Sequence, residues 1–515
     1  MMTRFRTSIF LFALQLFALS VYADIKLVSP FGDHMVLQQG TKVPVWGTAD
    51  PAERVTVSFL KQKFVTTTDA NGQWKISLNK LAYGGPYSIT VSGKNTVILK
   101  DVYVGEVWLC SGQSNMDMTV AREDRYWCGV FNEAEEVASA NYPTIRFFDV
   151  DFTPNEKQQK EVRGKWEVVS PQTVGHMSAA AYFFARDLQK KLGVPVGLLT
   201  TAFGASTAEA WIRKEALQAN PRFTYILDTF QSKLNRYYAD TAATRKYAAA
   251  YEKWKIDAAK AKAEGKDEVR SPRNPNPAND QHNPYVLWNG MVAPLVPYAI
   301  KGALWYQGES NGPTAKIYKD IMETLIADWR LQWGGEPFPF IYVQLANHQK
   351  LITEPVKDDP MVTVRDAQLQ NLSLPNTAMV VAIDNANPGD PNDIHPKNKQ
   401  DIGKRLALAA LRTAYKQKVV YSGPLYESLK VEGNKIRLQF KHTGSGLMTK
   451  GDTLKGFAIA GADKKFLHAD AVIERNTIVL WNAAVPVPAA VRYGWSKNPP
   501  VNLYNKEGLP ASPFK

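Results

Sequence analysis

The sequence predicts a central α/β domain with a largely parallel sheet, flanked on each side by a small β-sandwich. In residues 101–416, apolar runs of strand length alternate with helical patterns. In residues 24–100 and 417–515, short alternating runs lie between Gly, Pro and Asn turns, which is typical of sandwiches. A chain of 515 residues is long enough for about three domains of ordinary size.

Residues 1–23 predict a secretory signal peptide. Arg4 and Arg6 precede an apolar run at residues 9–21, and Val21 and Ala23 suit the −3 and −1 positions of a cleavage site after Ala23. The run is shorter than the roughly 20 apolar residues that span a bilayer. We therefore expect a periplasmic or extracellular protein with no membrane contact after cleavage.

Six apolar runs predict the strands of the α/β domain: residues 104–110, 144–150, 196–201, 300–306, 338–345 and 378–384. Near-continuous hydrophobicity is what a strand buried on both faces requires. Ser178 is a predicted cap of a helix that ends at Gly193. Apolar residues at every fourth position from Ile317 to Trp329 predict another helix, and a last one follows His395 to about Tyr415.

An insertion at residues 214–284 interrupts this alternation. Residues 214–265 are polar, rich in Ala, Lys and Tyr, and helical in pattern, and the Pro/Asn-rich run 271–284 must be a loop. Such an insertion either covers the active site or decorates the surface. The sequence leaves both interpretations open.

The composition excludes several functional classes. The net charge is +13, but no Lys/Arg-rich run is present, so we expect no nucleic-acid binding. A basic surface would attract acidic substrates, but the favoured interpretation is that the charge is scattered over the surface. The two cysteines, Cys110 and Cys128, could form a disulfide in an oxidising compartment, and Cys110 is equally compatible with a free core thiol. Residues 384–390 carry oxygen ligands without the spacing of an EF-hand, and we expect neither a metal nor another cofactor.

Four polar turns follow predicted strands and carry the chemistry. They are SGQSNM at residues 111–116, AFGAS at 202–206, WYQGESN at 305–311 and NDIHP at 392–396. All four belong at the carboxyl edge of the sheet, where open α/β sheets bind ligands. A serine needs a base and oxyanion donors to act as a nucleophile, and these turns can supply both to Ser114.

One of the seven histidines suits the role of base. His34, His442 and His468 fall in the β-domains, and His176 and His282 in loops. His395 lies in a strand-to-helix turn with a carboxylate two residues before it. His348, which follows another strand end, is the second candidate.

These turns resemble the sequence blocks of the SGNH (GDSL-like) hydrolases, in the form shared by sialate O-acetylesterases and related carbohydrate acetylesterases. The resemblance extends to LWNGM at 287–291, RDAQ at 365–368, RYGW at 492–495 and NLYNKEGLP at 502–510, and so covers nearly the whole chain. It implies a flavodoxin-like SGNH hydrolase domain. The activity it implies is a serine esterase that hydrolyses acetyl esters on a carbohydrate.

The resemblance also implies roles for individual residues. Ser114 would be the nucleophile and His395 the base, with an oxyanion hole of the Ser114 N–H, the Gly204 N–H and the Asn311 side chain. The wider SGNH pattern has Asp three residues before the His, where this chain has Asn392. We expect Asp393 to orient His395 instead, with Glu309 as the alternative. Gln113, Gln307, Glu309 and Arg365 are expected to bind substrate or support the site.

O-acetylated sialic acid is the leading candidate substrate. The name of the family indicates it, and Arg365 could bind the carboxylate of this sugar. An esterase acting on acetylated xylan or another hemicellulose is the alternative within the class. A non-catalytic carbohydrate-binding protein is the alternative outside it. The oligomeric state is not indicated by the sequence.

Overall fold

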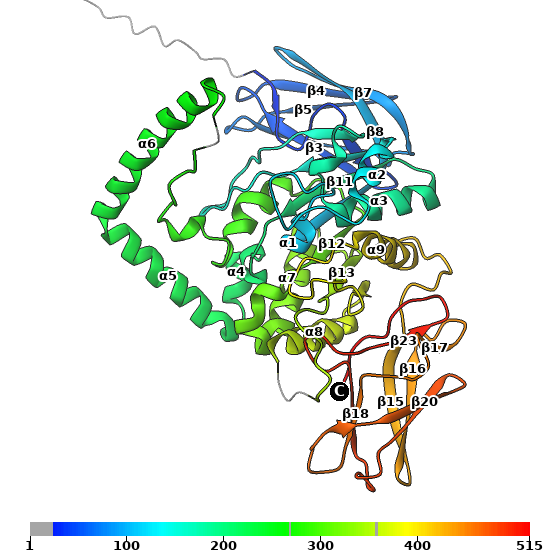
Figure 1. Cartoon of the computed structure of the whole chain (residues 1–515). Coiled ribbons are helices and arrows are strands. Elements are labelled where there is room, and N and C mark those ends of the chain that lie inside the picture. Colours follow the sequence, from blue (N-terminus) through cyan, green and yellow to red (C-terminus); the bar gives the residue numbers. More distant parts are fainter. Residues whose placement is uncertain (1–23, 267–268, 356–358) are drawn as a thin grey trace, which may run out of the picture.

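The computed structural model describes residues 24–266, 269–355 and 359–515, and its centre is a mixed sheet between helices (Figure 1). The strand order is β10-β9-β11-β8-β12-β13-β14, parallel throughout except for β10, which pairs antiparallel with β9. The strands are β8 (Thr96–Gly112), β9 (Tyr142–Asp149), β10 (Trp166–Val169), β11 (Val196–Ala202), β12 (Gly302–Tyr306), β13 (Phe340–Gln344) and β14 (Thr377–Val381). The six predicted strands are therefore confirmed, whereas the sequence did not predict β10.

Strand β8 joins the N-terminal β region to this sheet. Its first half pairs antiparallel with β7, and its second half pairs parallel with β11 and β12. The expected boundary at residues 100 and 101 thus falls inside one strand. The other strands of this region are β1 (Lys26–Leu27), β2 (Val36–Gln38), β3 (Val43–Thr48), β4 (Arg54–Phe59), β5 (Gln62–Thr67), β6 (Gln73–Leu78) and β7 (Gly84–Ser92).

Helices cover both faces of the sheet, as the predicted pattern requires. Helices α3 (Ala179–Leu192) and α9 (Lys399–Thr413) pack on one face with Trp108 and Cys110, while α7 (Tyr318–Gln332) and α8 (Pro360–Gln370) pack on the other with Leu109. Successive residues of β8 point to opposite faces, and both faces are buried. Helix α3 begins and ends as predicted: Ser178 Oγ accepts from the Ala181 N–H, and Gly193 is left-handed.

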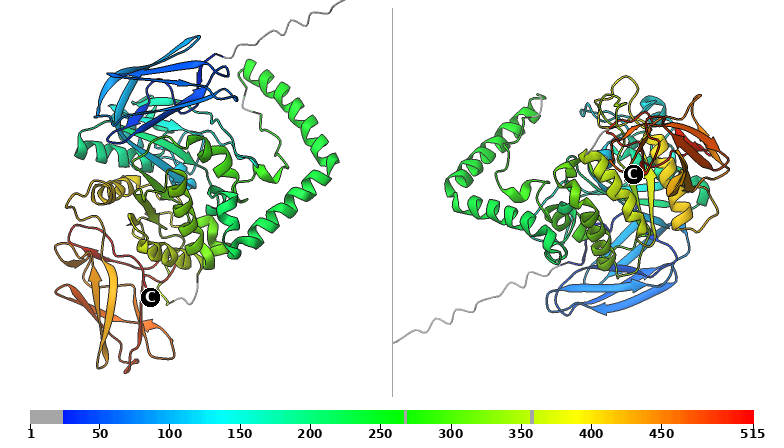
Figure 2. Two further views of the ribbon diagram at one scale, coloured as in Figure 1. Left: turned by 180° about the vertical axis from the view of Figure 1, so that it is seen from behind. Right: turned by 90° about the horizontal axis from the view of Figure 1, so that it is seen from below.

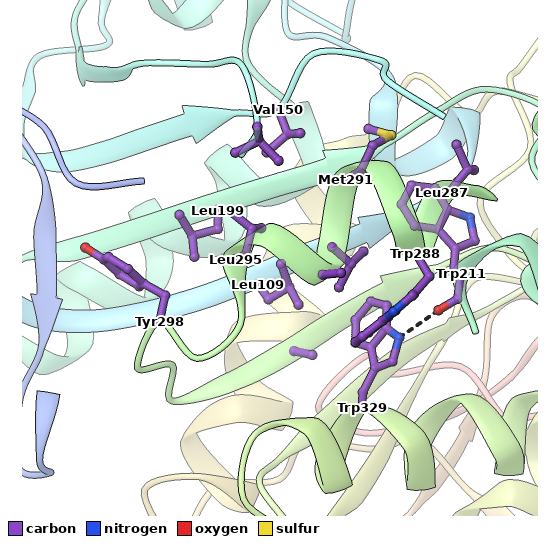
Figure 3. Close-up of a cluster of buried hydrophobic side chains, with 14 of the residues drawn as sticks. Leu109, Val150, Leu199, Trp211, Leu287, Trp288, Met291, Leu295, Tyr298 and Trp329 are labelled. Carbon is purple, nitrogen blue, oxygen red and sulfur yellow. Dashed lines mark hydrogen bonds between the residues drawn. The ribbon is translucent and has the colours of Figure 1, made fainter. Parts of the chain in front are cut away.

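Indole rings fill the core on the α7 side (Figure 3). Trp211, Trp288 and Trp329 are fully buried there, near Leu109 and Leu199 of the sheet. The Trp329 Nε1–H donates to the carbonyl of Trp211 at 2.9 Å, whereas Trp288 Nε1 has no hydrogen-bond partner among the described residues. Trp211 belongs to the segment that follows the Gly204 turn, and this packing holds that turn against the sheet.

The insertion forms an arm. Its helices are α4 (Lys214–Gln218), α5 (Thr224–Ala239) and α6 (Thr241–Ala263), as the helical pattern predicted. No residue of α6 is buried. In both Figure 1 and Figure 2, α5 and α6 form a V that stands away from the body, and the chain returns between the arm and the body.

The C-terminal β region lies at the opposite end of the α/β region from the N-terminal one (Figure 1). It has its own apolar core, which includes Leu438, Ile459 and Tyr493. Its strands are β15 (Leu425–Glu432), β16 (Lys435–Lys441), β17 (Leu447–Thr449), β18 (Phe457–Ala460), β19 (Leu467–His468), β20 (Asp470–Glu474), β21 (Thr477–Trp481), β22 (Ala490–Tyr493) and β23 (Leu503–Asn505).

The structure bears on two further features of the chain, namely the pairing of its two cysteines and the presence of membrane-spanning helices. Cys110 and Cys128 are both buried and unpaired in the structure. The predicted signal peptide lies outside the described residues. Within those residues, no helix has the length and apolar character that crossing a membrane requires.

Candidate active site at the carboxyl edge of the sheet

Ser114 stands where β8 ends. Gly112 has φ = 146°, and a Cβ at this position would lie 2.2 Å from the carbonyl oxygen of Tyr306, so only glycine fits. The next residue, Gln113, donates its N–H to the same carbonyl at 3.0 Å. The chain then enters the short helix α1 (Ser114–Asp117), and the Ser114 N–H is one of the helix's first N–H groups, which lack intrahelical acceptors.

His395 and Asp393 form the expected contact. The Nδ1 atom of His395 lies 3.2 Å from Oδ1 of Asp393, which also accepts the backbone N–H of His395 at 2.9 Å. The other carboxylate oxygen of Asp393 accepts from Asn387 at 3.0 Å. Both side chains are partly buried, at 15% and 19% exposure. This carboxylate therefore fixes the orientation of the ring and leaves Nε2 as the atom remote from it.

The alternative partners of the ring contact other groups. Glu309 accepts from the Asn115 side chain at 2.7 Å. The backbone carbonyl oxygen of Asn392 lies 3.0 Å from Nε2 of His348. His348, the second candidate for the base, therefore lies beside the His395 turn but is engaged with the main chain.

Asn115 joins three of the four turns. Its Nδ2 donates to Glu309 Oε1 at 2.7 Å and to the carbonyl of Ile394 at 3.1 Å, and its Oδ1 accepts from Lys399 Nζ at 2.7 Å. Lys399 also donates to the carbonyl of Pro396 at 2.9 Å. Asn115 and Lys399 are fully buried. The residue after Ser114 is thus bonded to the residue before His395.

The electrostatics of this network keep the imidazole neutral. Burial and, to a smaller extent, the ammonium of Lys399 lower the pKa of His395 to about 4, although Asp393 opposes both. Burial also lowers the pKa of Lys399 to about 7, opposed by Glu309, and burial raises the pKa of Glu309. The neutral ring is the form that can accept a proton from a serine.

Ser114 and His395 do not form a hydrogen bond with each other in the described part of the chain. Catalytic hydrogen bonds are often long or poorly aligned until substrate is bound. Gly204 is close to the nucleophile, because a Cβ built on it would lie 3.7 Å from Ser114 Cβ. The second turn therefore lies beside Ser114, and the fourth turn contacts the next residue, Asn115.

The expected oxyanion role of Asn311 does not agree with its contacts. Its Nδ2 donates to Glu209 Oε2 at 2.7 Å and to Thr314 Oγ1 at 2.9 Å, and its Oδ1 accepts from the Ala208 N–H at 3.0 Å. Both amide hydrogens are thus used within a fully buried site. In this structure Asn311 fastens the third turn to the segment after Gly204, and it has no hydrogen left for an oxyanion.

The two glutamines are buried and hold turns together. Gln113 Oε1 accepts the N–H groups of Gly308 and Ser310, each at 3.2 Å. Gln307 Nε2 donates to the Ser206 carbonyl at 3.0 Å and to Asn311 Oδ1 at 2.6 Å. These contacts give both residues a supporting role.

The prediction that Arg365 binds a substrate carboxylate is wrong. Its side chain is 1% exposed, and its guanidinium donates to backbone carbonyls of two regions. Leu345 and Ala346 follow β13, and Ser496 and Lys497 lie in the C-terminal β region. A planar guanidinium can satisfy several carbonyls at once, and here it joins the C-terminal region to the sheet.

Sequence reasoning missed the loop that covers His395. The Trp127 ring lies 4.8 Å from the His395 ring at 37°, and the Arg125 guanidinium lies over Trp127 and 3.3 Å from Asp117. Lys397 holds this loop by donating to the carbonyls of Trp127 and Cys128 at 2.9 and 3.0 Å. No local pattern marks this loop, because its place depends on contacts between distant segments.

Lys399 was also missed, although the sequence carried a signal. It is the first residue of α9, where the helix dipole disfavours a positive charge. A lysine at such a position indicates a specific partner, which here is the Asn115 side chain.

The described residues include no group of three or more His, Cys, Asp and Glu side chains arranged for a metal ion. In the oxygen-rich stretch 384–390, Asp384 pairs with Arg405 at 2.8 Å and accepts from the Tyr504 hydroxyl at 3.1 Å. Its carboxylate is therefore part of an ion pair.

Three comparisons with known proteins show the family of the chain. A family model described as "Carbohydrate esterase, sialic acid-specific acetylesterase" matches residues 287–412. The sialate O-acetylesterase of Mus musculus is 27% identical over 95% of this chain and 94% of its own length. That of Homo sapiens is 28% identical over 95% of this chain and 92% of its own length. The crystal structure of a carbohydrate acetylesterase from Xanthomonas citri is 34% identical, covers 95% of this chain and 99% of that one, and has a TM-score of 0.78.

The similarity to acetylesterases over 95% of the chain shows that the protein is a carboxylic ester hydrolase. The chain belongs to the family of sialate O-acetylesterases and related carbohydrate acetylesterases, and it is a carbohydrate O-acetylesterase. The family resemblance predicted from the sequence is confirmed.

Lys399→Met should raise the pKa of His395, because it removes a positive charge that disfavours the imidazolium. The wild-type kcat/KM should fall on the acid side with a midpoint near the His395 pKa of about 4, since only the neutral ring is a base. In the variant this midpoint should move to higher pH. Lys404→Met, an exposed change on the same helix, is the control and should leave the midpoint in place. A folded Lys399→Met protein with an unmoved midpoint would contradict the assigned role.

Proposed function

We propose that this enzyme is a secreted esterase that removes acetyl groups from a sugar, with sialic acid as the leading substrate, through a serine-bound acyl intermediate. The observation that carries the proposal is the Asp393–His395 pair, held by Asn115 beside the helix that begins at Ser114. In this proposal the nucleophile Ser114 comes from one turn at the edge of the sheet, and the base His395 and the orienting carboxylate of Asp393 come from another.

In the proposed mechanism, Ser114 Oγ attacks the acetyl carbonyl while His395 Nε2 takes its proton. The N–H groups of Ser114 and Gly204 would bind the oxyanion of the tetrahedral intermediate, the Gly204 N–H in exchange for its hydrogen bond to the Asp117 carboxylate. His395 then gives the proton to the sugar oxygen as the sugar leaves. Water, activated by the same imidazole, hydrolyses the acetyl-enzyme and restores the serine.

The proposed substrate is inferred from the names of similar proteins. Those from mouse and human are named sialate O-acetylesterases, and the matching family model is described as specific for sialic acid. The relative from Xanthomonas citri, by contrast, is named only as a carbohydrate acetylesterase. Acetate release from O-acetylated sialic acids, compared with release from acetylated xylan oligomers, distinguishes sialate from hemicellulose specificity.

The finer architecture is part of the proposal. When β9 and β10 at one edge of the sheet are left aside, the remaining order β11-β8-β12-β13-β14 is 2-1-3-4-5 in chain order, which supports a flavodoxin-like SGNH domain at residues 101–416. Residues 24–100 and 417–515 would be β-sandwich domains, and residues 214–284 an insertion. Cleavage of a signal peptide at residues 1–23 would place the enzyme in the periplasm or outside the cell.

Ser114→Ala should lower kcat for p-nitrophenyl acetate by at least about 10³-fold, because loss of a triad nucleophile removes the covalent route. Ser111→Ala is the matched control, since Ser111 Oγ donates to the Thr201 carbonyl at 2.7 Å and should not take part in the reaction. A loss of less than about tenfold in Ser114→Ala would exclude Ser114 as the nucleophile.

Asp393→Asn should lower kcat by at least about 10²-fold with little change in KM, because the carboxylate stabilises the imidazolium that forms during the reaction. Glu309→Gln should have a smaller effect on kcat, since Glu309 contacts Asn115 rather than the ring. Steady-state kinetics of both variants decide the assignment. A larger loss in Glu309→Gln than in Asp393→Asn would transfer the orienting role to Glu309.

A further inference from the structure

The Pro/Asn-rich run of the insertion lines a pocket that the catalytic residues do not explain. The wall consists of Lys233 from α5 and residues of the returning chain: Arg273, Asn274, Pro275, Asn276, Pro277, Asn279, Asp280, Gln281, His282 and Asn283. Amide side chains predominate, and the rest of the polar lining is charged. Such a lining suits a ligand with many hydroxyl groups rather than an apolar one.

The pocket adjoins the catalytic site at the second turn. Gln281 Nε2 lies 3.4 Å from the carbonyl of Gly204, whose Cβ position is 3.7 Å from Ser114 Cβ. The backbone of this stretch is fastened to the same turn, because the carbonyls of Gln281 and His282 accept from the N–H and the hydroxyl of Thr207 at 3.4 and 3.3 Å. The Gly204 turn thus lies between this wall and Ser114, and a sugar that crosses the turn would reach both.

The contacts of its residues give the pocket a fixed shape. Asn283 is buried, its Nδ2 donates to the Pro277 carbonyl at 2.7 Å, and its Oδ1 accepts from Lys233 Nζ at 2.8 Å. The Asn276 side chain accepts from the Ala278 N–H at 2.9 Å, which stabilises the turn between them. The arm thus contributes to the pocket through Lys233 on α5.

The charges of the wall favour an anion. Lys233 and Arg273 are cationic, and Asp280 is the only carboxylate among the lining residues. That carboxylate is paired with His282 at 2.7 Å, and the hydrogen bond raises the pKa of His282. Arg273 is exposed, so its guanidinium is accessible to a carboxylate from solution.

We propose that this pocket binds the sugar of the substrate and that Arg273 and Lys233 recognise a carboxylate on it. The amide side chains would bind hydroxyl groups of the same sugar. The inference rests on the proposed function, because it places an O-acetylated acidic sugar at Ser114. It also gives the insertion a function in substrate selection.

The test compares an O-acetylated sialic acid with its carboxamide, which lacks the negative charge. Wild-type enzyme should show at least a tenfold higher kcat/KM for the acid. Arg273→Gln and Lys233→Gln should reduce this preference severalfold or more, mainly through KM, when rates are normalised to p-nitrophenyl acetate. Arg245→Gln, an exposed arginine on α6 outside the pocket, is the matched control and should keep the wild-type preference.

A binding measurement separates the pocket from the chemistry. By calorimetry, the Ser114→Ala protein should bind free sialic acid at least tenfold more tightly than the Ser114→Ala/Arg273→Gln protein does. Equal affinities, or an acid preference that persists in both pocket variants, would overturn the inference. The proposed function fails by a different result, namely no acetate release by wild-type enzyme from any acetylated sugar, and the calorimetry reports on the pocket in that case too.

Discussion

Asn115 makes the contacts on which the active site depends. One buried amide bonds Glu309 of the third turn, Ile394 of the fourth and Lys399 of the helix that follows it. These residues are distant in sequence, and Asn115 is buried with both its amide nitrogen and its amide oxygen bonded to them. Because a buried amide loses free energy when its hydrogen bonds are broken, these bonds hold the residue after Ser114 against the residue before His395.

The same network sets the chemistry of the base. Low solvent access and a buried ammonium favour the neutral imidazole, whereas Asp393 stabilises the charged one. The base is thus unprotonated at rest and gains a stabilising partner when it takes the serine proton. This is the difference between ground state and transition state that a general base must exploit.

The sequence predicted what depends on local pattern. The strands and the caps Ser178 and Gly193 follow from hydrophobic spacing and backbone conformation, and the four turns follow from their place after those strands. What it could not predict depends on tertiary contacts. Arg365 and Asn311 carry suitable chemistry for binding and catalysis, but backbone carbonyls and Glu209 occupy their donors. Trp127 reaches His395 only because a long loop folds back.

The most direct test of the account is to trap the intermediate. Wild-type enzyme mixed with p-nitrophenyl acetate and quenched in acid during the burst should be digested with trypsin and examined by mass spectrometry. The account predicts one acetyl group on Ser114, in the peptide that spans residues 101–122. An acetyl group on another residue, or turnover with no acetyl-enzyme under any quench, would contradict it.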